Sequence, residues 1–217
     1  MEPLAPDLPE LLTATPEALA GADRIELEGV RIDGSDEGDG AVIAAARVRA
    51  RETELRGVRF DADAVRSVEL VDVVLRDCEL SNLVVREARL RRVDIRGSRL
   101  VGIDLGRAEI RDLRMVDCSM ALATLAAATL GSVELQRVNL SESVWMDAAL
   151  RGVALVDCEL SGADFRGASV DGLAIRGATL EGIIGVASLR GLRMTWSDVL
   201  ASAGALAAAL GIGVEPD

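Results

Sequence analysis

The sequence of 217 residues contains no histidine, lysine or tyrosine, and its only aromatic side chains are two phenylalanines and two tryptophans. All 24 of its basic residues are therefore arginines. General acid–base catalysis would rest on Asp and Glu alone, and no serine stands in a G-x-S-x-G context. We therefore expect a protein that is not an enzyme. A core with so few aromatics must be built from aliphatic side chains.

The sequence also lacks long apolar segments. Its first residues, Met-Glu-Pro-Leu-Ala-Pro-Asp, have neither the basic nor the apolar region of a secretory signal. No apolar stretch reaches the roughly 18 residues that a membrane-spanning helix needs. We therefore expect a soluble cytoplasmic protein with no membrane contact.

A period of five residues runs from Thr53 to Gly182. Every residue at a multiple of five is apolar, from Leu55 to Leu180, through 26 consecutive units. A second inward candidate stands two residues before each centre, and Asp63 is the only charged residue in that series. Neither a helix nor an ordinary strand has this alternation of two and three residues. The pattern indicates a coil with short sides.

Two pentads carry a resemblance to a known family. Ala163-Asp164-Phe165-Arg166-Gly167 and Cys158-Glu159-Leu160-Ser161-Gly162 are similar to the consensus A-(D/N)-L-X-X of pentapeptide-repeat proteins. The resemblance implies an all-β fold, a right-handed quadrilateral parallel β-helix, in which four pentads make one coil. The centre and the residue two positions earlier would point inward. Stability would come from stacking of neighbouring repeats, and both ends would need caps.

The three cysteines follow the same geometry. Cys78, Cys118 and Cys158 are 40 residues apart, which is two coils, so all three would lie at inward positions of one side. That separation is too long for a disulfide, and no histidine or close cysteine pair offers a metal site. We expect core thiols, no metal and no cofactor.

The sequence divides into three parts. Residues 1–22 form an acidic, proline-containing cap segment, with a helix start at Thr15-Pro16-Glu17. Residues 23–194 form the β-helix, regular over 53–182, with two early pentads in a different phase. Between these pentads and the regular run lies an acidic loop at 35–40. Residues 195–217 form a C-terminal helix and tail.

The C-terminal helix carries one apolar stripe at helical spacing. Its simplest role is to close the end of the coil. The segment also resembles that of actinobacterial pentapeptide-repeat proteins, some of which dimerise end to end. A cap alone and a cap that also forms a homodimer both remain open. The stripe consists of Trp196, Val199, Leu200, Ala203, Leu206, Ala207 and Leu210.

The resemblance also suggests a partner. The best-known activity in this family is the binding of DNA gyrase and topoisomerase IV by an acidic rod that mimics duplex DNA, which modulates quinolone sensitivity. Net charge is −12, but residues 53–182 hold 21 acids against 17 arginines. We expect inter-coil ion pairs among Glu69, Arg89 and Glu109 and among Asp72, Arg92 and Asp112, and no direct nucleic-acid binding. One side leans negative, with Asp61, Glu79, Glu142, Glu159 and Glu181 against two arginines.

A rival hypothesis is a scaffold or interaction module for another protein. Residues 120–131 carry no charge, and their outward positions are apolar. Val144 and Met146 would lie one coil further on the same side. We name this surface, made of Ala121, Leu122, Ala126, Ala127, Val144 and Met146, the apolar belt. The acidic loop, with Asp36, Glu37 and Asp39, is a second candidate contact.

Overall fold

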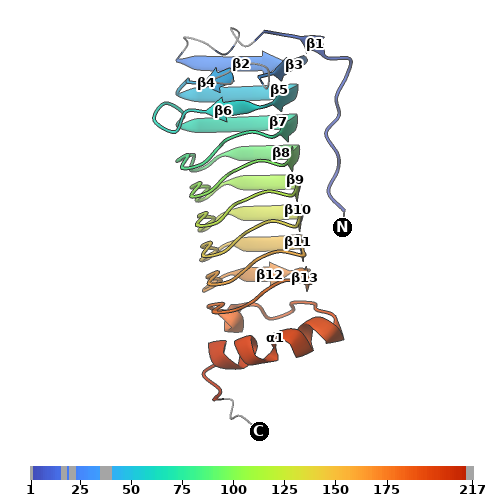
Figure 1. The fold of residues 1–217 in the computed structure, drawn as a ribbon, viewed down its shortest axis with the longest axis vertical. Coiled ribbons are helices and arrows are strands. Elements are labelled where there is room, and N and C mark those ends of the chain that lie inside the picture. Colours follow the sequence, from blue (N-terminus) through green and yellow to red (C-terminus); the bar gives the residue numbers. More distant parts are fainter. Residues whose placement is uncertain (1, 16–18, 20–22, 35–40, 214–217) are drawn as a thin grey trace.

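The pentads stack into a parallel β-solenoid whose coils repeat every 20 residues. The computed structural model describes residues 2–15, 19, 23–34 and 41–213. Glu109 pairs with Thr129, and Thr129 pairs with Ala149, each twenty residues later in the chain. The strands lie one above another along the stack (Figure 1). The predicted fold class is confirmed.

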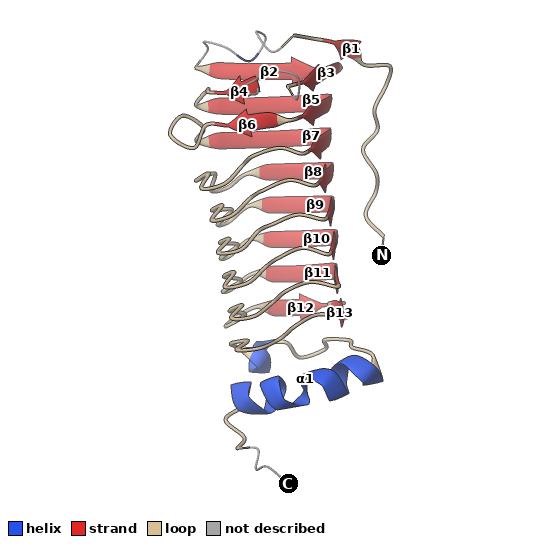
Figure 2. Cartoon of the chain, in the orientation of Figure 1, coloured by secondary structure: helices blue, strands red, loops and turns tan. Residues whose placement is uncertain are grey.

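The solenoid is almost entirely β-structure, with one α-helix across its C-terminal end (Figure 2). The main sheet has the strand order β1-β3-β5-β7-β8-β9-β10-β11-β12, with β2 on β5 and β13 on β11, and β4 pairs with β6 separately. A 3-10 helix, Val186–Ser188, precedes α1, Trp196–Ala209. The strands are β1 Leu12–Thr13, β2 Arg24–Glu28, β3 Val30–Asp33, β4 Ala41–Ile43, β5 Arg47–Arg56, β6 Val58–Phe60, β7 Ser67–Arg76, β8 Arg89–Arg96, β9 Glu109–Val116, β10 Thr129–Gln136, β11 Ala149–Val156, β12 Ser169–Asp171 and β13 Ala174–Arg176.

A corner follows each pentad centre by two residues. From Asp72 to Gly182 every fifth residue has a positive φ, between 50° and 77°. Glycine adopts this conformation without steric cost, and Asn and Asp tolerate it better than other residues do. The corner series is interrupted only around Asp61–Arg66, where Asp63 replaces an apolar inward residue.

The core is a column of aliphatic side chains, as the composition predicts. Centres such as Leu55, Leu75 and Leu160 are fully buried. Trp145 and Phe165 stand one coil apart in the same column, with their rings stacked at 5.5 Å between centroids. The Trp145 indole N–H donates to the Ser143 hydroxyl at 2.8 Å, which satisfies the buried polar group. The cysteines are free and buried, and burial raises the pKa of the Cys78 thiol to about 11.

The first coil contains the inserted segment. The pairing offset falls from 23 residues at Asp33 and Arg56 to 17 at Ala41 and Val58. The chain between Asp33 and Ala41 therefore holds six more residues than the chain opposite it. The acidic loop residues Asp36, Glu37 and Asp39 lie outside the described residues, as does most of the predicted helix start at Thr15-Pro16-Glu17.

Residues 2–11, which we call the leader, run back along the outside of the stack (Figure 1). The Asp7 N–H donates to Asp72 Oδ1 at 3.0 Å, and the Leu4 N–H donates to Asp112 Oδ1 at 3.2 Å. Of the predicted cap segment, Leu12–Thr13 pairs with β3 and Leu19 is buried in the core. The leader itself does not cover the end of the coil.

The helix α1 begins at a side-chain cap. Thr195 Oγ1 accepts the Asp198 N–H at 3.2 Å, and Asp198 Oδ1 accepts the Gly177 N–H of the last coils at 3.0 Å. Ser202 is the buried residue of the helix, and Ala205 and Leu206 pack against the core. The small-residue face of the helix thus contacts the coil.

The expectation that the large apolar stripe closes the coil is wrong for most of its members. Val199 is half-buried and Leu206 packs on the core, but Trp196, Leu200, Ala203 and Leu210 are exposed. The side chains of Leu189, Leu192 and Met194 already cover the end of the core. The remaining surface is narrow and admits small side chains, so the helix turns its large residues outward.

Candidate protein-binding surface

Each coil of the solenoid has four sides, which we number by their centres. Side 1 holds Leu90, side 2 Ile95, side 3 Leu100 and side 4 Leu105. The eight-residue strands β8 to β11 cover sides 1 and 2. Sides 3 and 4 are joined from coil to coil by single bridges, such as Glu79 with Arg99 and Thr124 with Val144.

The five carboxylates predicted for one acidic side all lie on side 3. They fall into two groups along the rod, because side 3 of the two coils between Glu79 and Glu142 carries no acid. Glu142 and Glu181 are exposed, whereas the other three are half-buried. The first group is Asp61 and Glu79, and the second group is Glu142, Glu159 and Glu181.

Two of these carboxylates have partners within the rod. Glu79 Oε2 lies 3.6 Å from Arg99 Nε on the next coil. Glu159 Oε1 accepts the Ser161 N–H at 2.9 Å, and the hydrogen bond from Ser161 holds the pKa of Glu159 below its usual value. Glu159 therefore stays ionised at neutral pH, as a contact with a cationic partner would require.

Leu122 is the unusual residue of this surface. It occupies a corner between sides 3 and 4 with φ of 60°, and its side chain is 54% exposed. The corresponding corners of the coils on either side are Gly102 and Glu142, and those beyond are Asn82 and Gly162. A bulky apolar residue in the left-handed region costs about 1 kcal/mol or more. The site keeps an apolar side chain in water at the expense of backbone strain, which is typical of functional positions.

The rest of the apolar belt surrounds Leu122. Thr124 and Val144 are bridged neighbours on side 4, as predicted. Met146 is half-buried, and its sulfur lies 3.9 Å from Arg166 Nη2. Val84, 49% exposed, extends the apolar surface along the same column. The belt thus lies beside Glu142 of the second acidic group, which follows Leu122 by one coil at the same corner.

The ion pairs between coils are formed only in part as expected. Arg92 bonds to Asp72 through two nitrogens, one of them with Nε at 2.6 Å from Oδ1. Glu69, however, pairs with Arg49 at 3.0 Å on the preceding coil, and Arg89 forms no ion pair with described residues. The predicted column of Glu69, Arg89 and Glu109 is therefore wrong as a ladder.

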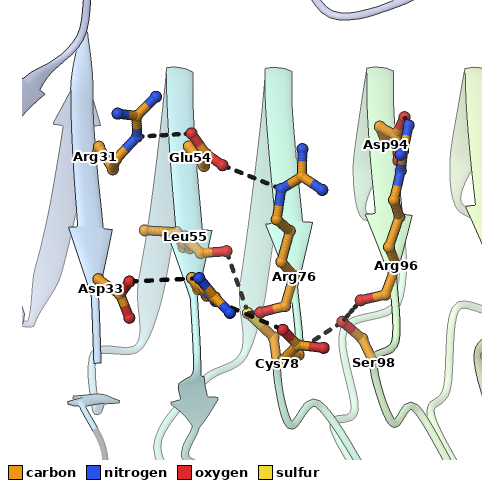
Figure 3. Close-up of polar contacts among 11 residues, drawn as sticks. Arg31, Asp33, Glu54, Leu55, Arg76, Cys78, Asp94, Arg96 and Ser98 are labelled. Carbon is orange, nitrogen blue, oxygen red and sulfur yellow. Dashed lines mark hydrogen bonds and ion pairs between the residues drawn. The ribbon is translucent and has the colours of Figure 1, made fainter. Parts of the chain in front are cut away.

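Side 2 carries an ion-pair network that the sequence analysis missed. Glu54 accepts hydrogen bonds from Arg31 at 2.7 Å and from Arg76 at 3.1 Å, so one carboxylate joins three coils (Figure 3). Burial opposes the charged form, but these two arginines hold the pKa of Glu54 below its usual value. A register of 23 residues for the first coil, unknown from sequence, is needed to bring Arg31 opposite Glu54.

The outer face of α1 is a second exposed apolar surface. Trp196 is 75% exposed and Leu200 is 60% exposed, and Leu210 continues the same face. Among the described residues no helix is long and apolar enough to span a membrane. In the same part of the chain no group of three His, Cys, Asp or Glu side chains is placed to hold a metal ion.

These features define a parallel β-solenoid with a packed interior and its distinctive residues on the outside. The inward cavity beside Trp145 has a volume of about 20 Å³, which holds little more than one water molecule. Residues 69–107 and 146–182 match the family model for pentapeptide repeats in eight copies. The chain belongs to the pentapeptide-repeat family, as its sequence pattern predicts.

The chain is similar to several solved structures at low identity. One is a trypsin-treated form of QnrB1, a plasmid-mediated fluoroquinolone resistance protein, at 19% identity and a TM-score of 0.43, covering 95% of this chain and 100% of that one. Another is HetL of the cyanobacterium Nostoc, a pentapeptide repeat protein involved in heterocyst differentiation regulation, at 18% identity and a TM-score of 0.35, covering 88% and 92%. No curated protein matches the sequence.

Proposed function

We propose that this chain is a non-catalytic, protein-binding rod whose contact surface is the apolar belt and the adjacent carboxylates of side 3. The observation that carries the proposal is Leu122, an exposed leucine held in a left-handed corner. Folding alone favours Gly, Asn or Asp there. Burial of the belt by a partner would compensate for the strain, since apolar area contributes about 25 cal/mol per Å² removed from water.

The named target that we propose is a type II topoisomerase, bound by mimicry of duplex DNA. The net charge of −12 and the excess of carboxylates on side 3 support this target, because DNA-binding sites recognise phosphate charge. The alternative is a scaffold that binds another protein through the belt. The two differ in the groups that carry affinity, which are the carboxylates in the first case and Leu122 in the second.

A DNA gyrase supercoiling assay, with and without a quinolone, tests the target. We expect the full-length chain to inhibit supercoiling or to protect gyrase from the drug. Replacing Glu142, Glu159 and Glu181 with Gln should abolish the effect, whereas Thr179→Gln serves as the control on side 3. If the unmodified chain has no effect at micromolar concentration, the topoisomerase target is wrong.

The scaffold alternative has its own test. The double variant Leu122→Asp and Met146→Asp should lose a partner captured by the unmodified chain, while its circular dichroism stays unchanged. Equal capture by both proteins would exclude the belt as the contact surface.

We further propose that the outer face of α1 contacts a second copy of this chain. The support is the exposure of Trp196, Leu200 and Leu210 together, since a helix face of this kind is rarely left in water. A two-fold axis through this face would join two rods end to end. A truncation that ends at Gly191 removes the helix and should leave a monomer.

A further inference from the structure

Side 1 carries a row of arginines without counter-ions. The strand register places Arg91 directly against Arg111, and Arg151 follows in the same column two coils later. Arg89 flanks this row in the neighbouring column. All four are exposed, and none forms an ion pair with another described residue. We call these four residues the arginine stripe.

The stripe is exceptional within this rod. Other arginines of the same coils pair with an acid one coil away, as Arg107 does with Glu87 at 2.9 Å and Arg137 with Asp117 at 2.5 Å. Like charges that face each other across neighbouring strands are destabilising. An acidic protein with 36 carboxylates has ample means to neutralise Arg91 and Arg111, yet they remain unpaired. The stripe is thus suited to an anionic ligand from outside.

The surface around the stripe is hollowed and chemically mixed. Arg89, Arg91, Glu109 and Arg111 line one depression, which Asp112 borders. Gly131 separates Arg111 from Arg151 in the column, and a Cβ there would meet only the Arg111 side chain at 4.0 Å. A ligand on side 1 therefore meets cations together with carboxylate acceptors.

The leader shows what can bind beside this surface. Its Leu4 and Asp7 amides donate to carboxylates of Asp112 and Asp72 at the corner between sides 1 and 2. Three leader residues thus span two coils. An extended chain rises about 3.1 to 3.3 Å per residue, and two coils measure about 9.6 Å, so the two repeats coincide. An extended polypeptide keeps its register along this rod.

We propose that the arginine stripe on side 1 binds an extended acidic polypeptide of a partner protein, with acidic residues three positions apart. Arg91 and Arg111, one coil apart, together clamp one carboxylate, and Arg151, two coils beyond Arg111, takes the carboxylate three residues along. The peptide amides donate to Glu109, as the leader amides do to Asp72 and Asp112. This surface lies across the rod from side 3, and the proposal is independent of the belt.

The mixed chemistry favours a polypeptide over a nucleic acid. A phosphate backbone offers acceptors only, so Glu109 and Asp112 would repel it, whereas a peptide supplies amide donors and carboxylates together. The net charge of −12 adds a further barrier to a polyphosphate. The leader itself carries acids three residues apart, at Asp7 and Glu10, in an extended conformation.

The test is the binding of a fluorescent peptide that repeats Glu-Pro-Ala five times, measured by anisotropy with the full-length chain at low ionic strength. We expect saturable binding that weakens with salt. Arg91→Glu with Arg111→Glu should weaken it about tenfold or more, which corresponds to 1.4 kcal/mol. Arg59→Glu with Arg190→Glu changes the net charge equally on other surfaces and should leave binding within about twofold.

Three results would overturn the proposal. They are no binding of the Glu-Pro-Ala peptide at millimolar protein, equal losses in the two double variants, or tighter binding of a single-stranded DNA of the same length. Each variant is first checked by thermal unfolding, and Arg91→Gln with Arg111→Gln replaces the charge reversal if that protein fails to fold. The Leu122→Asp variant should bind the peptide normally, which separates this surface from the belt.

Discussion

Arg92 reaches back one coil to Asp72, with Nε 2.6 Å from Oδ1, and the same carboxylate oxygen accepts the Asp7 N–H at 3.0 Å. The Asp72 side chain is only 8% exposed. One buried carboxylate therefore connects two coils of the solenoid and fastens the leader. The hydrogen bond from Arg92 holds the pKa of Asp72 below its ordinary value.

We predict that Asp72→Ala releases the leader. A hydrogen bond to a charged group contributes about 1.5 to 3 kcal/mol, so hydrogen exchange of the Asp7 amide should accelerate by tenfold or more. Asp157→Ala, at an exposed corner away from the leader, is the control. An unchanged exchange rate in the Asp72 variant would show that the leader is held by other contacts.

Acid should release the leader of the unmodified chain. Because the folded-state pKa of Asp72 is lowered, its stabilising contribution is complete above the unfolded value of 3.8 and is lost as pH falls through the lower folded value. Exchange of the Asp7 amide followed toward low pH should reveal this loss, after correction for the intrinsic rate. A pH-independent protection factor would contradict the role of the Asp72 charge.

We predict that Leu122→Asn stabilises the fold. Asparagine tolerates the left-handed corner better than leucine does, and relief of this strain should raise the free energy of unfolding by about 1 kcal/mol in urea titrations. Leu122→Ala keeps most of the backbone penalty but removes the apolar side chain, so it should give little stability and the same loss of partner binding. A destabilised Asn variant would mean that Leu122 packs favourably in the free rod.

The stacked pair in the core should be sensitive to truncation. Phe165→Ala leaves a cavity beneath Trp145 and should cost about 3 to 5 kcal/mol, as large-to-small changes of buried aromatics do. The fluorescence of Trp145, buried in the unmodified chain, reports unfolding locally. The surface variant Thr179→Ala should change stability by no more than about 0.5 kcal/mol.

The sequence predicted the coil well because the signal for it is local and repeated. Each apolar centre specifies an inward position by itself, so residues such as Leu55 and Leu160 could be assigned without knowledge of their neighbours. The Thr124 and Val144 contact followed from the same arithmetic.

Other contacts depended on information that no short pattern holds. The leader is fixed by its own amides on two carboxylates, so its side chains carry no motif for that path. In α1 both faces are apolar, and the choice between them follows from the narrow area left beside Leu189 and Met194. The strain at Leu122 was accessible in principle, because its corner position could be counted from the pentads.

The buried thiols should weaken the fold at high pH. Burial raises the pKa of Cys78 to about 11 and also raises the pKa values of Cys118 and Cys158. These thiols stay neutral in the folded chain while those of the unfolded chain ionise, so stability is lost as pH rises above about 9, by up to about 1.4 kcal/mol per pH unit for each thiol. Urea titrations of the chain and of Cys78→Ala should show a shallower alkaline slope in the variant.

The exposed face of α1 leads to a prediction about assembly. If Trp196 and Leu200 pack against a second copy, light scattering should give the mass of a dimer, and Trp196 emission should shift to shorter wavelength as concentration rises. Leu200→Asp places a charge in the centre of this contact and should give a monomer, because an unpaired buried charge costs several kcal/mol. Ala201→Asp adds the same charge at an exposed position off the stripe and should leave the dimer intact. A monomeric mass for the unmodified chain at all concentrations would show that these side chains face solvent in the functional protein.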